Sequence, residues 1–347
     1  MRLATLLPVR RIVCIALIPG VLAGVLALAA GPPPAAGTRR AAPPLQQPEA
    51  TPARHVDRTQ LMRDAEALAS PAFEGRATGT PGGLRARRWI ADQFKAIGLS
   101  PLADDGYTQP FAVAPPGGRA TRPGDPPRRA AIEGANVVGR IAGRNPGAAA
   151  IVVTAHYDHL GVRDGVVHPG ADDNASGVAV LLAAARHFAA SAPPRPIVFG
   201  ALDAEEMGLE GARALLRSPL LPRRAIALNI NLDMVSRSAA SEIYAAGTYH
   251  SPWQVPILAD VQRRASVRIL FGHDRPAHLG GGLKDWTHSS DHGPFHDAGV
   301  PFVYFGVEDH ADYHTPTDTA DRVDPAFFGD AADMIVEAIR TFAARLQ

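Results

Sequence analysis

Residues 149–206 read AAIVVTAHYDHLGVRDGVVHPGADDNASGVAVLLAAARHFAASAPPRPIVFGALDAEE, and this stretch indicates the architecture. It begins with the apolar segment 149–154 and nearly ends with a second, 197–202, and both have the length and composition of buried strands. Between them, residues 176–190 are apolar and long enough for a buried helix. Continuous apolar strands joined by a helix are typical of a parallel sheet that is covered on both faces.

The same alternation continues on both sides of this stretch. We expect further strands at residues 136–141, 226–232, 243–246, 267–271 and 300–306, and further helices at residues 57–68, 84–97, 208–217, 255–265 and 327–346. The pattern predicts one α/β domain, a three-layer α/β/α sandwich around a mostly parallel mixed sheet. In such sheets the ligand site lies just beyond the carboxyl ends of the strands.

The N-terminal 54 residues differ from the rest of the chain. Basic residues precede the apolar stretch 12–30, which ends in small residues, so we predict a signal peptide or N-terminal anchor at residues 1–30. Residues 31–54 are rich in Pro and Ala and are expected to form a linker, which leaves 55–347 as the folded domain. We therefore expect an exported protein, periplasmic or secreted, with membrane contact only through an uncleaved N-terminal segment.

Charge and cysteine content exclude several classes of function. The 347 residues carry a formal net charge of +1, so no strong basic field points to nucleic acid as a partner. Cys14 is the only cysteine, which excludes an intrachain disulfide and a zinc site built from thiolates. Neither a His-Glu-x-x-His helix nor a Gly-x-Ser-x-Gly elbow is present. Any bound metal must therefore be held by histidine and carboxylate.

Residues that can bind a metal follow the predicted strands. Because the carboxyl ends of parallel strands meet at one edge, these residues should converge, and crowded carboxylates require counter-cations. Zinc binds carboxylate and imidazole well, and one carboxylate can bridge a pair of ions. The residues concerned, all after a strand or at the start of helix 176–190, are His156, Asp158, Asp173, Glu205, Glu206, Asp233 and His314.

Five motifs resemble, in order and spacing, the co-catalytic zinc aminopeptidases of family M28. They are His156-x-Asp158-His159, Pro-Gly-Ala-Asp172-Asp173-Asn-Ala-Ser-Gly, Leu-Asp-Ala-Glu205-Glu206-Met-Gly, Asn-Leu-Asp233-Met and Tyr313-His314-Thr-Pro-Thr-Asp. The resemblance runs from about Phe73 to the end and includes Gly75-Arg-x-Thr-Gly-Thr-Pro-Gly-Gly. It implies the zinc-exopeptidase fold, two co-catalytic Zn²⁺ ions, and peptide or protein substrates that lose N-terminal residues.

The resemblance also implies a role for each matching residue. The implied zinc ligands are His156, Asp173, Glu206, Asp233 and His314, with Asp173 bridging the two ions. Glu205 is implied as the general base, which accepts a proton from a water molecule that zinc has acidified. Asp158 is implied as a catalytic residue that orients His156.

Neighbouring residues carry further expectations. Asp172 is expected to cap the helix that follows it. The loop Ser289-Ser290-Asp291-His292 resembles a substrate-side loop of the family, so Asp291 and His292 are candidate substrate-binding residues. His159 is interpreted as a loop residue behind the ligands and not as a ligand. Pro294 argues against a continuous helix through the histidines of residues 288–296.

Other functions stay open beside aminopeptidase. The same metal pair would serve a carboxypeptidase or dipeptidase of the family. A glutaminyl cyclase is a relative that works with a single zinc ion. From a different class, the fold could serve as a binding module without turnover. The full set of ligands for two metals, together with Glu205, favours hydrolysis.

Overall fold

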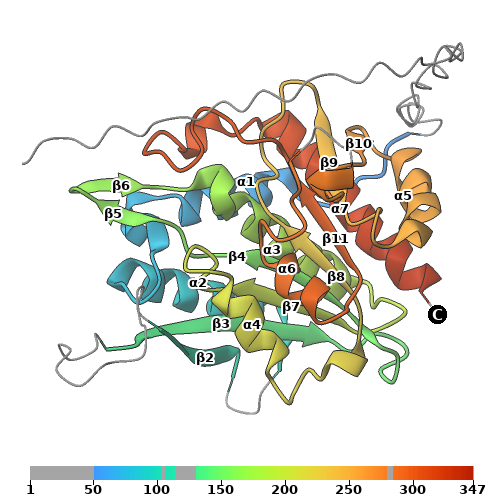
Figure 1. The fold of residues 1–347 in the computed structure, drawn as a ribbon, viewed down its shortest axis with the longest axis horizontal. Coiled ribbons are helices and arrows are strands. Elements are labelled where there is room, and N and C mark those ends of the chain that lie inside the picture. The colour runs from blue at the N-terminus through green and yellow to red at the C-terminus, as the bar shows by residue number, and fades with distance from the viewer. Residues whose placement is uncertain (1–50, 103–105, 115–129, 280–283, 347) are drawn as a thin grey trace, which may run out of the picture. The chain divides into compact units, whose positions relative to one another are not determined.

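The structure, a computed structural model, describes residues 51–102, 106–114, 130–279 and 284–346, all of which belong to one compact unit. Its centre is a mixed sheet in which nine strands are connected (Figure 1). The order is β1-β3-β7-β4-β8-β11-β9-β10, with β2 also beside β3. The strands are β1 (Ser100–Pro101), β2 (Thr108–Val113), β3 (Ile132–Ile141), β4 (Ala150–His156), β7 (Ile197–Leu202), β8 (Ile226–Leu232), β9 (Glu242–Ala246), β10 (Arg268–Leu270) and β11 (Phe302–Gly306).

The middle of the sheet is parallel, and an antiparallel pairing borders it on each side. β4 pairs in parallel with β7 and β8, and β8 pairs in parallel with β11. β3 runs antiparallel to β7, and β9 runs antiparallel to β11. A separate hairpin is formed by β5 (Gly161–Arg163) and β6 (Val166–His168). The predicted mostly parallel mixed sheet is confirmed.

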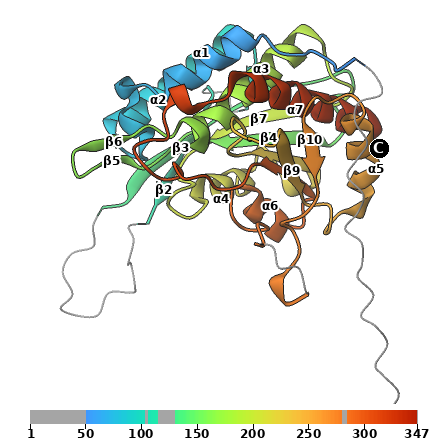
Figure 2. The ribbon, with the colours of Figure 1, turned by 90° about the horizontal axis from the view of Figure 1, so that it is seen from above.

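Helices cover both faces of the sheet. On one face, Ile151, Val153 and Ala155 of β4 pack in an apolar cluster with α1, α2, α3, α5 and α7. On the other face, Val152 packs in a second cluster with α4 and α6. Figure 2 shows α1, α2, α3 and α7 on the opposite side of the strands from α4 and α6. The helices are α1 (Arg58–Leu68), α2 (Pro81–Ile97), α3 (Gly177–Ala190), α4 (Glu210–Leu216), α5 (Val255–Gln262), α6 (His292–Asp297) and α7 (Pro325–Arg345), with short helical turns η1 (Pro71–Arg76), η2 (Ala171–Ser176), η3 (Arg223–Ala225), η4 (Pro252–Gln254), η5 (Ala277–Leu279) and η6 (Ala320–Arg322).

Helix boundaries follow from local chemistry. Asp57 caps α1 by accepting from the backbone N–H of Gln60, and Asp324 caps α7 by accepting from Ala326 and Phe327. α2 starts at Pro81, three residues before the predicted start, because Thr80 caps it and Pro is well suited to the first helical position. As expected, no continuous helix runs through residues 288–296, because His288 lies before α6. Pro294 is accommodated in the first turn of α6, where its missing N–H removes no helical hydrogen bond.

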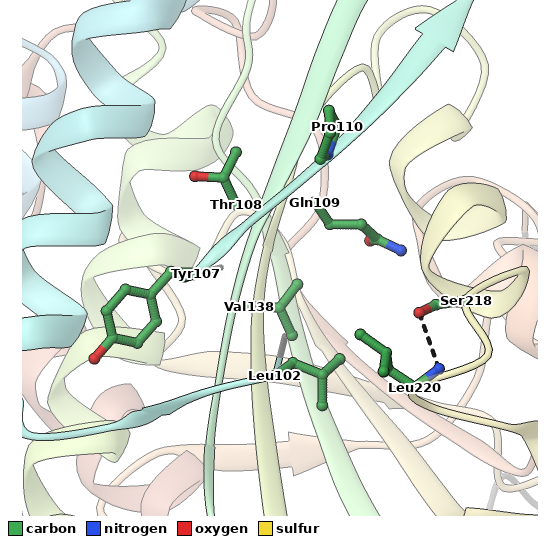
Figure 3. Close-up of a pocket in the computed structure, with 9 residues that line it drawn as sticks. Leu102, Tyr107, Thr108, Gln109, Pro110, Val138, Ser218 and Leu220 are labelled. Carbon is green, nitrogen blue, oxygen red and sulfur yellow. Dashed lines mark hydrogen bonds between the residues drawn. The ribbon is translucent and has the colours of Figure 1, made fainter. Parts of the chain in front are cut away.

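The sequence pattern missed the strands β1 and β2. Both pair with the same side of β3, and β2 contains Pro110, which is tolerated at a sheet edge because it lacks a backbone donor. A hollow of about 200 Å³ lies beside this edge, where Gln109 and Leu220 face each other (Figure 3). The described residues that line it include no charged side chain. No histidine or carboxylate among these described residues is available to hold a metal ion.

The predicted signal or anchor at residues 1–30 and most of the predicted linker lie outside the described residues. Among the residues that are described, no helix is long and apolar enough to cross a membrane.

Glu337 fixes the start of the folded domain to α7. Its carboxylate accepts from His55 Nε2 at 2.8 Å, Arg264 Nε at 2.8 Å and Arg340 Nη1 at 2.7 Å. Burial alone would raise the pKa of Glu337, but the hydrogen bonds from His55 and Arg340 lower it to about 2. A carboxylate with a lowered pKa stabilises the fold above its unfolded pKa, and this contribution is lost as the pH falls toward 2.

Replacing Glu337 by glutamine is expected to reduce the free energy of unfolding by about 1–3 kcal/mol at pH 7, the usual range for hydrogen bonds to charged groups. The deficit should shrink between about pH 4.5 and pH 2, because the wild-type carboxylate becomes protonated there. Urea unfolding across this pH range measures both effects. Glu66→Gln is the matched control, since Glu66 is exposed on α1 and makes no ion pair within the described ranges. An equal loss in both variants would contradict the prediction.

Candidate metal centre

Acidic and imidazole side chains leave the central strands at one edge of the sheet. His156 is the last residue of β4, Glu205 and Glu206 follow β7, and Asp233 follows β8. His314 lies in the loop after β11. Because β7, β4, β8 and β11 are parallel neighbours, their carboxyl ends share this edge.

A first group of possible ligands surrounds His156. Its Nε2 atom lies 3.3 Å from Asp173 Oδ1 and 3.3 Å from Asp233 Oδ1. All three side chains are buried, and their ligand atoms lie within 4.8 Å of one another. This group can hold one metal ion.

A second group shares Asp173 with the first. His314 Nε2 lies 3.0 Å from Asp173 Oδ2 and 3.3 Å from Glu206 Oε1. His159 Nδ1 also belongs to this group, 3.0 Å from Glu206 Oε1. Asp173 therefore faces the first group with one carboxylate oxygen and the second with the other, which is the arrangement of a bridging ligand. His159, interpreted from the sequence as a residue behind the ligands, thus lies beside Glu206 among the possible ligands of this group.

The separations fit zinc. For four ligands at zinc bond lengths of about 2.0–2.1 Å, the edges of the coordination tetrahedron are about 3.3 Å long. The distances of 3.0–3.3 Å between the histidine nitrogens and carboxylate oxygens of the two groups lie close to this value. Imidazole and carboxylate are also the donor types that zinc prefers. The residues present therefore fit two zinc ions, one in each group.

Charge in the second group is balanced between its acids and imidazoles. Burial opposes ionisation of Glu206, yet hydrogen bonds from His159 and His314 lower the pKa of Glu206 to about 2. Burial likewise opposes protonation of His314, but Asp173 and Glu206 raise the pKa of His314 to about 10. The carboxylates thus hold a proton on the imidazole of His314 unless a metal cation supplies the positive charge.

Asp158 holds the segment that follows β7. Its carboxylate accepts from the backbone N–H of Glu205 at 3.0 Å and from that of Glu206 at 3.3 Å. His156 Nδ1 lies closer to the carbonyl oxygen of Asp158, at 3.1 Å, than to its carboxylate, at 3.7 Å. The expectation that the Asp158 carboxylate orients His156 is therefore corrected. The backbone of Asp158 contacts the imidazole, and its side chain positions the two glutamates.

Glu205 faces the first group. It lines the same hollow as His156 and Asp233, but it belongs to neither ligand group. Burial raises the pKa of Glu205 well above its usual range, and the nearby charges of Asp233 and Asp291 raise it further. A carboxyl group that gains a proton readily beside a metal site is suited to move protons at near-neutral pH.

The loop that carries Asp173 is held by two other acids. Asp318 accepts from the backbone N–H groups of Asp172 and Asp173 at 3.0–3.1 Å. Asp172 accepts from the backbone N–H of Ser236 at 2.8 Å and from its hydroxyl at 2.7 Å. The expectation that Asp172 caps α3 is wrong, because its carboxylate binds this distant loop instead. Asn174 supplies the local contact by accepting from the N–H of Gly177.

Sequence reasoning missed Arg76 as a structural part of the site. Its guanidinium is completely buried and donates to the carbonyl oxygens of Tyr157, Leu68, Pro169 and Gly170 at 2.6–2.8 Å. These bonds join η1 to the end of α1, to the residue after His156, and to the segment just before η2, which contains Asp173. Burial lowers the pKa of Arg76 to about 10 despite the acids nearby.

A hollow of about 70 Å³ opens over the ligands. Aromatic and apolar side chains form one wall: Met234, Trp286, Tyr304, Val307 and Tyr313. Trp286 stacks on His273 with ring centroids 3.7 Å apart, and His273 Nε2 lies 2.7 Å from Glu308. The wall is therefore fixed from behind by a second layer of contacts.

Asp291 and His292 lie behind this wall. Both are fully buried, and neither is among the described residues that line the hollow. His292 Nε2 contacts the carbonyl oxygen of Trp286 at 2.7 Å, and burial lowers the pKa of His292 to about 3. Burial raises the pKa of Asp291 to about 7. These residues were expected to contact substrate. They lie instead behind the side chains that line the hollow, where His292 contacts the backbone of Trp286.

The acids after β11 are paired within the protein. Asp309 lies 2.8 Å from Lys284 Nζ, and Asp312 lies 2.7 Å from Arg237 Nη2. Asp309 also lines the hollow. Each of these two carboxylates therefore has a cationic partner within the protein.

Part of the chain is similar in sequence to known peptidases. Residues 136–339, more than half of the chain, match Peptidase family M28. Aminopeptidase YwaD of Bacillus subtilis (strain 168) is 34% identical over 203 residues. The match covers 54% of this chain and 40% of YwaD, so the chain spans less than half the length of this curated relative.

Two solved structures are similar in fold. An aminopeptidase from Aneurinibacillus sp. strain AM-1 has a TM-score of 0.63 at 19% identity, covering 82% of this chain and 93% of that one. The glutaminyl cyclase of Porphyromonas gingivalis has a TM-score of 0.61 at 18% identity, covering 83% of this chain and 99% of that one. At these identities the likeness shows the fold alone.

Proposed function

Because this chain belongs to peptidase family M28, we propose that it is a zinc-dependent aminopeptidase that releases N-terminal residues from peptide or protein substrates. We propose two zinc ions, with Asp173 as the shared ligand. His156 and Asp233 complete one site, and Glu206 and His314 belong to the other. The observation that carries the proposal is the position of Asp173, whose two carboxylate oxygens face two separate ligand groups.

Glu205 is proposed as the group that moves protons. When bound, a zinc pair makes a water molecule more acidic and polarises the carbonyl of the peptide bond. Glu205 lines the hollow beside His156 and Asp233, so its carboxylate can accept a proton there and return it to the departing amine. Asp158 positions Glu205 by accepting its backbone N–H.

The charge of the hollow supports preference for an amino end. Its described lining contains the acids Asp173, Glu205, Asp233 and Asp309 and no lysine or arginine. Bound zinc would neutralise Asp173 and Asp233, but the described lining still offers no lysine or arginine that could bind a C-terminal carboxylate. The one lysine close by, Lys284, is paired with Asp309. An aminopeptidase therefore fits these electrostatics better than a carboxypeptidase does.

Hydrolysis of a panel of aminoacyl-p-nitroanilides tests the proposal. Compounds with a free amine should be hydrolysed, and their N-acetylated counterparts should not. A chelator should abolish hydrolysis and added zinc should restore it. Metal content of the purified protein should be two zinc ions per chain.

Other outcomes would favour the alternatives. Cleavage that requires a free C-terminus would indicate a carboxypeptidase or dipeptidase. One tightly bound zinc with cyclisation of N-terminal glutamine would indicate a glutaminyl cyclase. Stable binding of zinc without any turnover would indicate a binding module. Export of the chain is proposed from residues 1–30 and is tested by sequencing the N-terminus of the secreted or periplasmic protein.

A further inference from the structure

The two ligand groups differ in size. The group around His156 offers three protein ligand atoms, whereas the group around His314 offers four, because His159 joins it. His159 Nδ1 lies 3.0 Å from Glu206 Oε1 and 3.6 Å from Asp173 Oδ2. No role among the proposed ligands has so far been given to this imidazole.

The path of the chain after β4 turns the His159 ring into the site. Its side chain is fully buried and lies against Gly170, where an added Cβ would approach the ring to 2.5 Å. The other ring nitrogen, Nε2, is also buried and has no hydrogen-bond partner in the part of the chain that the structure describes. The polar contacts found for the ring therefore run through Nδ1 to the carboxylates of Asp173 and Glu206.

The distances around Nδ1 suit a coordination sphere. His159 Nδ1, Asp173 Oδ2, Glu206 Oε1 and His314 Nε2 form four contacts of 3.0, 3.6, 3.0 and 3.3 Å. These values lie on either side of the edge of about 3.3 Å that a zinc tetrahedron requires. Resting on the proposed two-zinc function, we infer that His159 Nδ1 is the fourth protein ligand of the metal bound by Glu206 and His314.

This assignment makes the two metals unequal. Zinc with four protein ligands is closed in the manner of structural sites, whereas zinc with three keeps a position open. The open position then belongs to the ion held by His156, Asp173 and Asp233. Glu205 lines the hollow on the side of this ion, so the exchangeable position and the proton-moving group coincide. The ion at His159 is expected to bind more tightly and to anchor the bridging carboxylate.

A crystal structure of the zinc-loaded protein, with zinc located by anomalous scattering, tests the inference directly. His159 Nδ1 should lie about 2.0–2.1 Å from the zinc that Glu206 and His314 bind. A separation above 3 Å, with the Nδ1–H donating to Glu206, would overturn the inference. This measurement needs no variant and no activity.

Competition with a chelator in solution gives an independent result. His159→Gln removes Nδ1 and should lower the affinity for one of the two zinc ions by more than about 100-fold. Loss of a hydrogen bond outside the coordination sphere lowers metal affinity by only about 10–100-fold. His168→Gln is the matched control, since His168 lies in the neighbouring strand β6 and in neither ligand group. Equal zinc affinity in both variants would also overturn the inference.

Failure of the proposed function has a different signature. A wild-type protein that binds only one zinc ion at saturation would contradict the proposed zinc pair and this inference together. A wild-type protein that binds two ions, with Nδ1 of His159 beyond bonding distance from both, would contradict the inference alone.

Discussion

Replacing Glu205 by glutamine is expected to lower kcat by about 10²–10⁴-fold, the usual contribution of a general base, while both zinc ions stay bound. Glutamine has nearly the shape of glutamate but cannot accept and return a proton. Glu205 belongs to neither ligand group, so its loss should not weaken metal binding. Steady-state kinetics on an aminoacyl-p-nitroanilide and metal analysis of the same sample measure the two effects.

Glu210→Gln is the matched control for this experiment. Glu210 lies in the first turn of α4, carries the same chemical group, and is absent from the described lining of the hollow. Its replacement should leave kcat within about twofold of the wild type, as for surface substitutions in general. Full activity of Glu205→Gln would refute the assignment of the base. Loss of zinc from this variant would instead show that Glu205 is a ligand.

Replacing Arg76 by methionine is expected to reduce the free energy of unfolding by about 4 kcal/mol or more, because buried carbonyl groups left without donors are destabilising by about 1–3 kcal/mol each. The arginine donates to four carbonyl oxygens, and methionine fills much of the same space without a single donor. The backbone of Arg76 is already left-handed, with φ of 57°, so both side chains share that strain. The loss therefore reports on the hydrogen bonds.

Urea unfolding in the presence of a chelator measures this change without a contribution from bound metal. Arg88→Met is the matched control, since Arg88 is exposed on α2, and it should alter stability by no more than about 0.5 kcal/mol. The free energy of unfolding of Arg76→Lys should lie between those of Arg76→Met and Arg88→Met. An ammonium group can donate to some of the four carbonyl oxygens but not to all of them in the same geometry. Equal stability of Arg76→Met and Arg88→Met would contradict the role given to the buried guanidinium.

Much of the fold could be predicted because its central strands are continuous apolar runs. Predicted strands 197–202 and 226–232 coincide with β7 and β8, and the convergence of ligands follows from parallel neighbours. The start of α2 was placed too late because Gly82 and Gly83 resemble a loop. In the structure they lie in the helix, where an added Cβ on Gly82 would approach the carbonyl oxygen of Phe73 to 2.1 Å.

The surroundings of the candidate site were harder to predict. Arg76 binds backbone carbonyl groups, which leave no mark in the sequence of the segments that contain them. The direction of the His159 ring depends on the path of the loop after β4, and periodicity says nothing about such a path. Asp172 is a residue type that often caps helices, and it lies shortly before α3 in the sequence. Its carboxylate nevertheless accepts from Ser236, which is remote in sequence. Contacts between distant loops require the tertiary structure.

Asp318 has a consequence for how the enzyme is made. Its carboxylate accepts from the amide groups of Asp172 and Asp173, although it lies 146 residues beyond Asp172 in the sequence. During synthesis the segment bearing the shared ligand emerges well before this acceptor does, so the loop obtains its final hydrogen bonds only after residue 318 has been made. A chain that ended at residue 317 would retain all five proposed zinc ligands and would still lack the carboxylate that accepts from the amide groups of the Asp173 loop.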